Sequence, residues 1–379
     1  MKPSILICVD WFAPGYKGGG PIRSCVNFAY AMRDSYTIYV LTSDRDWGND
    51  AAYDGITPDT WMTFDEGIQV CYASPANLGY RAILEKIQAV SPDFIYLNSV
   101  YSLPFSIFPM LMKRFGTLKA TMVLAPRGML HSGALQYKSL KKKLFLALLR
   151  FLHIPQQLRY HATDAQESLD IQQQLYRSAD MITIANFPNI KQLAWQSTPK
   201  AASEIHIVFI SRIAEKKNLH FFLSLLKNIE HTIRLSVFGS FEDEHYRQTC
   251  LALVAALPPH ISVVFNGDIE HHQLPNALRD AHTFVLPTFG ENFGHAIFEA
   301  LQAGKPVLIS DQTPWRNLEA QRSGWDISLD NVSQWLQAVR TVAAWEQADF
   351  DTWSQAAWQY AKHYSENDSA KNDYLRLFY

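Results

Sequence analysis

Residues 282–303 read HTFVLPTFGENFGHAIFEALQA. The apolar run at its start predicts a buried strand over Thr283–Leu286, and the apolar spacing at its end predicts a helix over Gly294–Ala303. The turn between them contains two glycines, Gly290 and Gly294. A strand that passes through such a turn into a helix is the repeating unit of a parallel α/β sheet.

Two carboxylates in this stretch, Glu291 and Glu299, stand eight positions apart. A helix N-terminus presents unpaired N–H groups and a partial positive charge, so it can hold a phosphate, and Gly294 lets the backbone come close. Glu291 is expected at the mouth of the helix and Glu299 about one and a half turns inside. An acidic pair on an ordinary surface helix is the alternative, but the glycine turn after a strand favours a ligand site.

The alternation of short apolar strands with helices runs along most of the 379 residues. At about 150 residues per domain, this length predicts two domains. Residues 186–203, with two prolines and small polar residues, interrupt the alternation and are expected to join them. We expect α/β domains at 1–187 and 203–361, each a doubly wound parallel sheet, with a C-terminal helix at about 362–379 packing back on the first. Strands are expected at 4–9, 37–41, 68–72, 93–97, 121–125, 159–161 and 181–184, and at 205–210, 234–238, 262–265, 283–286 and 306–309.

Ligands of doubly wound sheets bind at the carboxyl ends of the strands, so the cleft between the two domains is the expected site. The segment VFISRIAEKKNL places Arg212 and Lys217 after a buried strand and before a helix. Cations are unfavourable near a helix N-terminus, which favours a ligand role over a solvated helix start. Arg and Lys together can hold a diphosphate and neutralise charge on a leaving group.

A glycine-rich segment, PGYKGGGPIR at 14–23, follows the first strand and enters a helix through Pro21. Such loops can bind phosphates. A dinucleotide fold with Asp44 as the ribose acceptor is an alternative, but the spacing is not G-x-G-x-x-G. A simple flexible loop is the other alternative.

Composition limits the partners. Lys and Arg number 34 and Asp and Glu 36, a net charge of −2, so the chain has no overall charge that would attract nucleic acid. The four cysteines have no metal-ligand spacing, and Asp44-Arg45-Asp46 is interpreted as structural despite its D-x-D form. His161 is expected to be structural, and His271 and His272 to be solvated. The N-terminal apolar run is short for a signal peptide, and no run reaches about 18 apolar residues, so we expect a cytoplasmic protein.

Taken together, these segments resemble the retaining GT-B glycosyltransferases of family four, which build bacterial polysaccharides and lipopolysaccharide. The resemblance extends over nearly the whole chain. It is carried by SRIAEKKNL, by ENFGHAIFEALQAGKPVL with its E-x7-E spacing, by APRGMLHSGALQYKSLKKKL and by HATDAQE. It implies two Rossmann-like domains facing each other across a cleft and hexosyl transfer from a nucleotide-diphosphate sugar to a saccharide or lipid-linked acceptor.

The resemblance also implies residue roles. Arg212 and Lys217 match the cations that bind the diphosphate. Glu291 matches the first glutamate, which orients the donor sugar, and Glu299 the second, which contacts the ribose. No metal and no cofactor are then needed, since the cations and helix dipoles replace the metal, and the donor is a UDP- or GDP-sugar. Further donor-binding positions are Gly18, Gly19, Gly20, Gly267, Asp268, Ile269, Asn292, Phe293 and Gly294.

The chain departs from the family pattern at two positions. Arg127 stands where many members have a catalytic histidine, with His131 nearby, and Asn218 stands where glycine often follows the lysine. Asn accepts unusual backbone angles, so the second change is interpreted as neutral. A nucleotide-sugar epimerase, a glycoside hydrolase that uses Glu291 and Glu299, and a non-catalytic nucleotide-sugar-binding protein remain the alternatives.

Residues 137–154, YKSLKKKLFLALLRFLHI, are basic at one end and apolar along their length. Such a helix can lie on anionic lipid as a peripheral membrane contact on the inner face of the cytoplasmic membrane. A helix that faces the core with its lysines outward is an equally good interpretation of the pattern.

Overall fold

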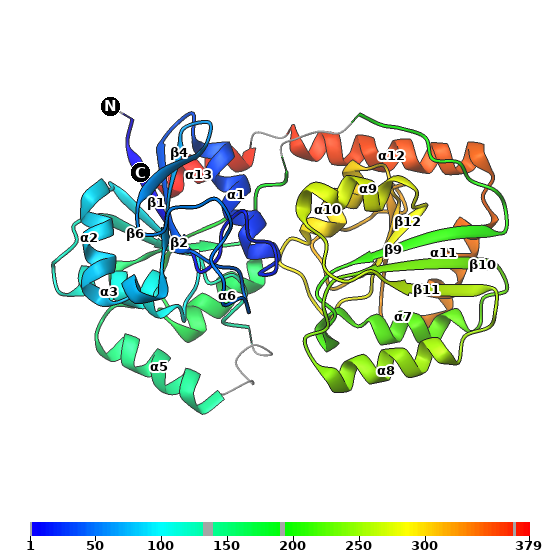
Figure 1. Ribbon diagram of the computed structural model, residues 1–379, viewed down its shortest axis with the longest axis horizontal. Helices are drawn as coiled ribbons and strands as arrows, with labels where there is room; N and C mark the ends of the chain where they lie inside the picture. The colour runs from blue at the N-terminus through cyan, green and yellow to red at the C-terminus, as the bar shows by residue number, and fades with distance from the viewer. Residues whose placement is uncertain (1, 132–138, 190–193, 367–368) are drawn as a thin grey trace. The chain divides into compact units, whose positions relative to one another are not determined.

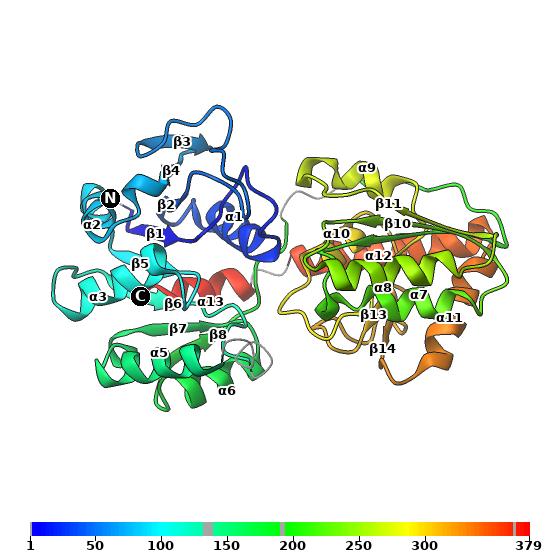
Figure 2. The same ribbon diagram turned by 60° about the horizontal axis from the view of Figure 1, so that its bottom comes forward.

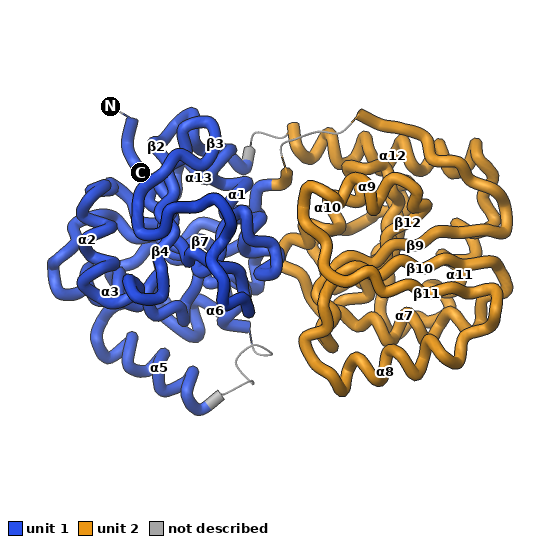
Figure 3. Tube along the Cα trace, in the orientation of Figure 1, with its two compact units in different colours: residues 1–187, 368–379 blue, residues 188–367 orange. Residues whose placement is uncertain are grey.

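The computed structural model describes residues 2–131, 139–189, 194–366 and 369–379. Its chain divides into two compact units (Figure 3). Unit 1 comprises Met1–Phe187 and Asp368–Tyr379, and unit 2 comprises Pro188–Asn367. Each unit is described by itself below.

The described strands of unit 1 form an eight-stranded sheet in the order β3-β4-β2-β1-β5-β6-β7-β8. All neighbouring pairs are parallel except β3 and β4, which are antiparallel. The central strands are apolar at nearly every position because helices cover both faces of the sheet. The strands are β1 Ser4–Cys8, β2 Thr37–Ser43, β3 Trp61–Asp65, β4 Ile68–Ala73, β5 Phe94–Leu97, β6 Thr121–Leu124, β7 Arg159–Ala162 and β8 Asp180–Thr183.

The two faces of this sheet build two separate cores. Ile5 and Ile7 of β1 point into a core shared with α1 (Gly20–Met32) and α13 (Ser369–Leu377). Leu6 and Cys8 point the opposite way, as expected for a strand, into a core shared with the other helices. Figure 2 shows α5 and α6 of this second group near β7 and β8. These other helices are α2 Tyr80–Val90, α3 Phe108–Arg114, α5 Ser139–Phe151 and α6 Ala165–Gln174.

The described strands of unit 2 form a six-stranded, wholly parallel sheet in the order β11-β10-β9-β12-β13-β14. The chain starts in the middle at β9, runs to one edge through β10 and β11, and then returns to β12 on the other side of β9. This reversal makes the carboxyl end of β9 and β12 a topological switch point. The strands are β9 Glu204–Ile210, β10 Thr232–Phe238, β11 Ile261–Phe265, β12 Thr283–Leu286, β13 Val307–Ser310 and β14 Gly324–Ile327.

Helices cover both faces of the second sheet as well. α7 (Leu219–Leu226) and α8 (Glu244–Ala255) lie on one face, and α9 (Leu274–Arg279) and α10 (His295–Gln302) on the other (Figure 1). α11 (Val332–Ala344) packs against α7 and β9, and α12 (Gln347–Ser365) packs against α10. The described residues after β14 thus form α11, α12 and α13, of which α13 belongs to unit 1.

Two parallel α/β sheets are the predicted fold class, and the structure confirms it. Two strands were missed: β3 pairs antiparallel at one edge, and β14, the short GWDI segment, closes the other sheet. Asn218 adopts φ 60° and ψ 34°, so an asparagine does take the left-handed position after Lys217.

Candidate active site

The loops that follow β9, β10 and β11 are joined by backbone hydrogen bonds at the carboxyl end of the unit 2 sheet. The N–H of Ser211 donates to the carbonyl of Phe238 at 3.1 Å, and the N–H of Gly239 to the carbonyl of Gly267 at 2.7 Å. Gly239 has φ 130°, and a Cβ there would stand 2.0 Å from the carbonyl oxygen of Ser211. Only glycine fits, so Gly239 sets the spacing between these loops.

The loop after β12 is held between its two neighbours. The Phe289 N–H donates to the carbonyl of Lys216 at 2.8 Å, and the hydroxyl of Thr288 reaches the same oxygen at 3.1 Å. On the other side, the Glu291 N–H donates to the carbonyl of Gln312 at 3.1 Å. Because both anchors are backbone carbonyls, the position of Glu291 is set by the main chain of the loops that follow β9 and β13.

The turn into α10 requires glycine at position 294. Gly294 is the N-cap with φ 78° and ψ 61°, and a Cβ there would lie 2.7 Å from Cδ1 of Ile297. Phe293 beside it is buried, and its carbonyl accepts a hydrogen bond from the indole N–H of Trp315. The first N–H groups of α10 therefore sit in a packed turn, next to Glu291 and the half-buried Asn292.

The charged side chains of the predicted site form pairs of opposite charge. The Lys217 ammonium contacts the Glu291 carboxylate, and their side chains are only 14% and 15% exposed. Arg212 pairs with Glu242 in the loop after β10. The pKa of Lys216 is lowered by partial burial and by the nearby charge of Lys217. Three cations, Arg212, Lys216 and Lys217, therefore gather in the loop after β9, and two of them are paired with carboxylates.

Glu299, on α10, has a partner that the sequence did not indicate. Nε2 of His271 lies 2.8 Å from Oε1 of Glu299, and the carboxylate is 12% exposed. The prediction that His271 is solvated is therefore wrong, whereas His272 is 72% exposed and meets Glu270. His271 follows Gly267, Asp268 and Ile269, so this bond connects α10 to a segment that was predicted to bind the donor and of which Gly267 and Asp268 are exposed.

Unit 1 contains the predicted glycine loop. Gly18 and Gly19 are half-buried and Gly20, the first residue of α1, is exposed. Gly19 has φ 69° and is the N-cap of the helix. The loop is held by Asp46, whose Oδ2 accepts the N–H groups of Tyr16 at 2.8 Å and Lys17 at 3.0 Å.

Asp46 therefore positions the glycine loop, a role that the D-x-D pattern did not indicate. Asp44 pairs with Arg45 instead, and is buried. Within the described part of the chain, no cluster of three or more His, Cys, Asp or Glu side chains is arranged to hold a metal ion.

Arg127 lies at the carboxyl end of β6 with φ 56°. Its guanidinium donates to Asn98 Oδ1 at 2.7 Å and to the Tyr96 hydroxyl at 2.9 Å, and also contacts Asn186. The buried His161 bridges Tyr96 Oη at 2.6 Å and a backbone carbonyl at 2.8 Å, and burial lowers its pKa to about 3. His161 is structural, as predicted.

Two segments that carried the resemblance meet in unit 1. Glu167 of HATDAQE is fully buried and accepts the N–H of Gly128, in the PRGML segment, at 2.6 Å. Nδ1 of His131 contacts the carboxylate of Asp170 on α6. In unit 2 the structure brings together Arg212, Lys217, Glu291–Gly294 and Glu299; in unit 1 it holds the glycine loop and Arg127.

Two parallel α/β units of this topology define the GT-B fold, and solved structures agree. A sucrose-phosphate synthase from Thermosynechococcus elongatus superposes with a TM-score of 0.68 at 14% identity, over 100% of this chain and 98% of that one. Anabaena Alr3699/HepE, solved in complex with UDP and glucose, also gives 0.68 at 14% identity, over 99% and 98% of the chains. At such identities the likeness establishes the fold.

Residues 191–343 match the family model of glycosyl transferases group 1, in agreement with the glycosyltransferase resemblance of the sequence. Phosphatidyl-myo-inositol mannosyltransferase of Mycobacterium leprae is 28% identical over 149 residues, 37% of this chain and 38% of the relative. O-antigen chain mannosyltransferase B of Escherichia coli is 28% identical over 128 residues, 32% and 30% of the two chains. The match thus spans well under half of these curated relatives.

Proposed function

We propose that the protein is a retaining glycosyltransferase that moves a hexosyl group from a nucleotide-diphosphate sugar to a saccharide or lipid-linked acceptor. The observation that carries this proposal is the Lys217–Glu291 pair beside the glycine-capped N-terminus of α10. A cation, a carboxylate and the N-terminal end of a helix at one point suit a ligand with a diphosphate and a hydroxyl-bearing ring.

Each residue then has a defined task. Arg212 and Lys217 hold the diphosphate and stabilise the charge that develops on it as the leaving group. Glu291 accepts hydrogen bonds from hydroxyls of the donor sugar, and the backbone at Asn292, Phe293 and Gly294 positions the same ring. Glu299 accepts the ribose hydroxyls, with Gly267, Asp268 and Ile269 beside the base.

Donor binding would then exchange partners within the site. The diphosphate competes with Glu291 for the Lys217 ammonium and with Glu242 for Arg212. A freed Glu291 carboxylate gains a sugar hydroxyl in place of the ammonium. Because protein cations balance the diphosphate charge, we propose that turnover needs no metal ion.

The relatives support a hexose donor and an envelope product. HepE was solved with UDP-glucose, two curated relatives are named mannosyltransferases, and WaaG, with a TM-score of 0.59 at 13% identity, is titled a glycosyltransferase involved in lipopolysaccharide biosynthesis. We therefore propose a UDP- or GDP-hexose donor and a role in bacterial surface polysaccharide or lipopolysaccharide synthesis, including O-antigen.

Glycine loop residues Gly18, Gly19 and Gly20 are proposed to contact the donor phosphates, and Arg127 the reacting sugar. The proposed location is the cytoplasm, including a peripheral contact of residues 137–154 with the membrane. Among the described helices, none is both long and apolar enough to span a bilayer.

A thermal-shift panel of UDP-, GDP- and ADP-sugars tests the proposal, because a ligand at 100 times its Kd stabilises by about 2.7 kcal/mol. The donor that stabilises is then incubated with acceptor saccharides, with and without EDTA. We expect transfer with retained anomeric configuration, unchanged by EDTA and lost in Lys217→Met. An epimer formed from donor alone, glycoside hydrolysis without nucleotide release, or binding without turnover would each replace the proposal by one of its alternatives.

A further inference from the structure

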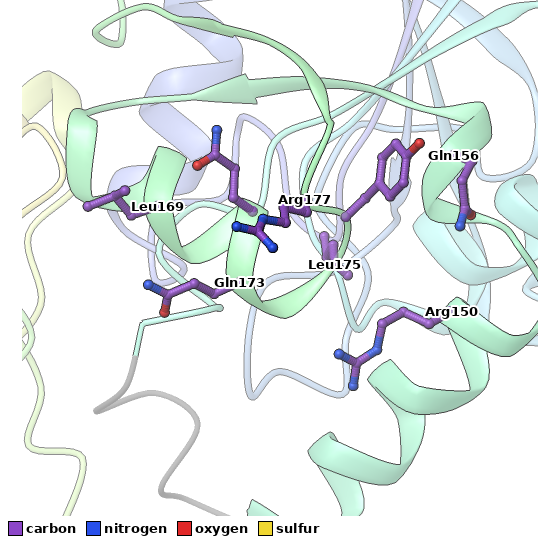
Figure 4. Close-up of a pocket in the computed structure, with 8 residues that line it drawn as sticks. Arg150, Gln156, Leu169, Gln173, Leu175 and Arg177 are labelled. Atoms are coloured by element: carbon purple, nitrogen blue, oxygen red, sulfur yellow. The ribbon is translucent and has the colours of Figure 1, made fainter.

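A hollow with a volume of about 590 Å³ opens in unit 1 where the ends of α5 and α6 meet (Figure 4). This volume falls within the range of small-molecule binding sites, about 300–1,000 Å³. α5 contributes Arg150, and η3 (Pro155–Gln157) contributes Gln156. Most of the other lining residues come from α6 and the turn after it, among them Gln172, Gln173, Tyr176 and Arg177. This surface is called here the α6 hollow.

The α6 hollow lies at the amino end of the unit 1 sheet. η3 leads into β7, and Arg177 stands shortly before β8. Since α6 joins two parallel strands, it runs back from the carboxyl end of β7 to the amino end of β8. Its first turn contains Glu167, which is bonded to Gly128 beside Arg127. The ten residues of α6 span about 15 Å, so one helix length separates the hollow from the Arg127 loop.

Two cations line the α6 hollow without a partner in the described part of the chain. The guanidinium groups of Arg150 and Arg177 are exposed and form no hydrogen bond or ion pair with a described residue. None of the described lining residues is Asp or Glu. A guanidinium binds a carboxylate through two parallel hydrogen bonds. The α6 hollow therefore suits a ligand that carries negative charge.

The rest of the lining suits a saccharide better than a bare anion. The amides of Gln156, Gln172 and Gln173 are exposed and have no hydrogen-bond partner among the described residues. Each amide offers an acceptor oxygen and an NH₂ donor, which matches hydroxyl groups that donate and accept. The half-buried Tyr176 adds an aromatic ring, against which the apolar face of a sugar ring can pack. An inorganic anion would fill only a small part of this volume.

We propose that the α6 hollow binds a saccharide that carries carboxylate groups. Arg150 and Arg177 pair with the carboxylates, and the three glutamine amides bind hydroxyl groups. The origin of this saccharide rests on the proposed function: it is an acidic stretch of the acceptor chain, held on unit 1 while another part of the same chain reacts. Binding at a second point raises the effective concentration of the chain at the first.

Isothermal titration calorimetry with trigalacturonate, maltotriose and inorganic phosphate tests the saccharide-binding proposal. The three probes are a trisaccharide with carboxylates, a trisaccharide without them and an anion without a sugar. We expect the wild-type chain to bind trigalacturonate about tenfold or more tightly than either other probe, and less tightly as salt is raised. Lys217→Met should bind trigalacturonate as the wild type does, because Lys217 belongs to the proposed donor site in unit 2.

Variants of the lining residues test the assigned contacts. Arg150→Gln and Arg177→Gln should each weaken trigalacturonate binding about tenfold, because each removes hydrogen bonds between charged groups. Gln172→Ala with Gln173→Ala should weaken it about fivefold and leave phosphate binding unchanged. The matched control is Arg81→Gln, on α2 of the same unit, whose side chain is 92% exposed. It should bind as the wild type does, and equal melting temperatures show that each variant is folded.

Three results would overturn the saccharide-binding proposal. They are maltotriose binding as tight as that of trigalacturonate, phosphate binding as tight as that of trigalacturonate, and wild-type affinity in both Arg150→Gln and Arg177→Gln. The second result would assign the α6 hollow to a phosphate group.

Transfer assays test the link to the acceptor chain. With oligosaccharide acceptors that contain a hexuronic acid, Arg177→Gln should raise the acceptor KM about tenfold and leave the donor KM unchanged. An unchanged acceptor KM would show that the α6 hollow does not hold the acceptor. The calorimetry contains no donor, so its failure and the failure of the glycosyl-transfer proposal are distinguishable.

Discussion

Replacing Glu291 by Gln separates the two things that this carboxylate does. It removes the charge that pairs with Lys217 and keeps the shape of the side chain. Exposed ion pairs are worth about 0–1 kcal/mol, and breaking a fully buried pair costs about 3–5 kcal/mol. With 14% and 15% of the two side chains exposed, this pair is intermediate. We expect a loss of about 1–2 kcal/mol in the free energy of unfolding of unit 2.

In a unit of this size, about 1 kcal/mol shifts the melting temperature by roughly 2–4 °C, so the variant should melt about 2–8 °C lower. Saturating UDP should raise the melting temperature of the variant more than that of the wild type, because the diphosphate supplies the anion that Lys217 has lost. Scanning calorimetry with and without UDP measures both shifts. Turnover should fall at least a hundredfold, because the sugar hydroxyls exchange a charged carboxylate for a neutral amide oxygen, which accepts hydrogen bonds more weakly.

Two controls make this prediction specific. Glu244→Gln breaks an exposed pair with Arg247 on α8 and should change neither the melting temperature nor the UDP response. Lys217→Met with Glu291→Gln removes both partners and should recover stability but not UDP binding. If Glu291→Gln responds to UDP no more strongly than the wild type, Lys217 is not a diphosphate ligand and the partner exchange is refuted.

Three further outcomes are expected. Gly239→Ala should cost about 3–5 kcal/mol and be visible as a collapsed melting temperature, because the new methyl would overlap the carbonyl of Ser211 at 2.0 Å; an unchanged melting curve would contradict the loop geometry. Glu299→Gln should raise the donor KM about tenfold or more at nearly constant kcat. His271→Phe removes the imidazole that orients the Glu299 carboxylate and should raise the donor KM less. Burial lowers the pKa of His161 from 6.5 to about 3, so between these pH values the imidazole is protonated in the unfolded chain and neutral in the folded chain. The free energy of unfolding of unit 1 should therefore decrease below pH 6.5, by at most about 1.4 kcal/mol per pH unit. His161→Gln should reduce that pH dependence.

The sequence contained enough to predict most strands, because parallel strands buried on both faces are nearly continuous apolar runs. It also contained the glycine turn and the E-x7-E spacing. The edge strands escaped for the opposite reason: β3, WMTFD, is half exposed, and β14, GWDI, is short and begins with glycine. These two strands form because they pair with β4 and β13, and such pairing cannot be predicted from the local sequence.

The side-chain pairs of the site could not be predicted from local sequence patterns, because their members are far apart in the chain. Lys217 and Glu291 stand 74 positions apart, and they meet because β9 and β12 are neighbours in the sheet. His271 and Glu299 stand 28 positions apart: His271 lies after β11, and Glu299 lies in α10, which follows β12. Sequence reasoning identified the charged residues that are proposed to bind a ligand and missed the partners that hold them. It also missed Asp46, which accepts two backbone N–H groups of the glycine loop, and Gly239, which sets the spacing of the loops after β9 and β10.

The hydrogen-bond partners of Arg127 bear on how a proton could be transferred in the proposed reaction. A guanidinium stays protonated at every pH at which the protein folds, so it can hold charge but cannot exchange a proton as the family's histidine can. Its bonds to Asn98, Asn186 and Tyr96 also fix it in one orientation at the end of β6. In the proposed retaining transfer, the proton of the attacking hydroxyl would therefore go to a group other than Arg127. The leaving phosphate oxygen, which Arg212 and Lys217 are proposed to bind, is the group that suits this role.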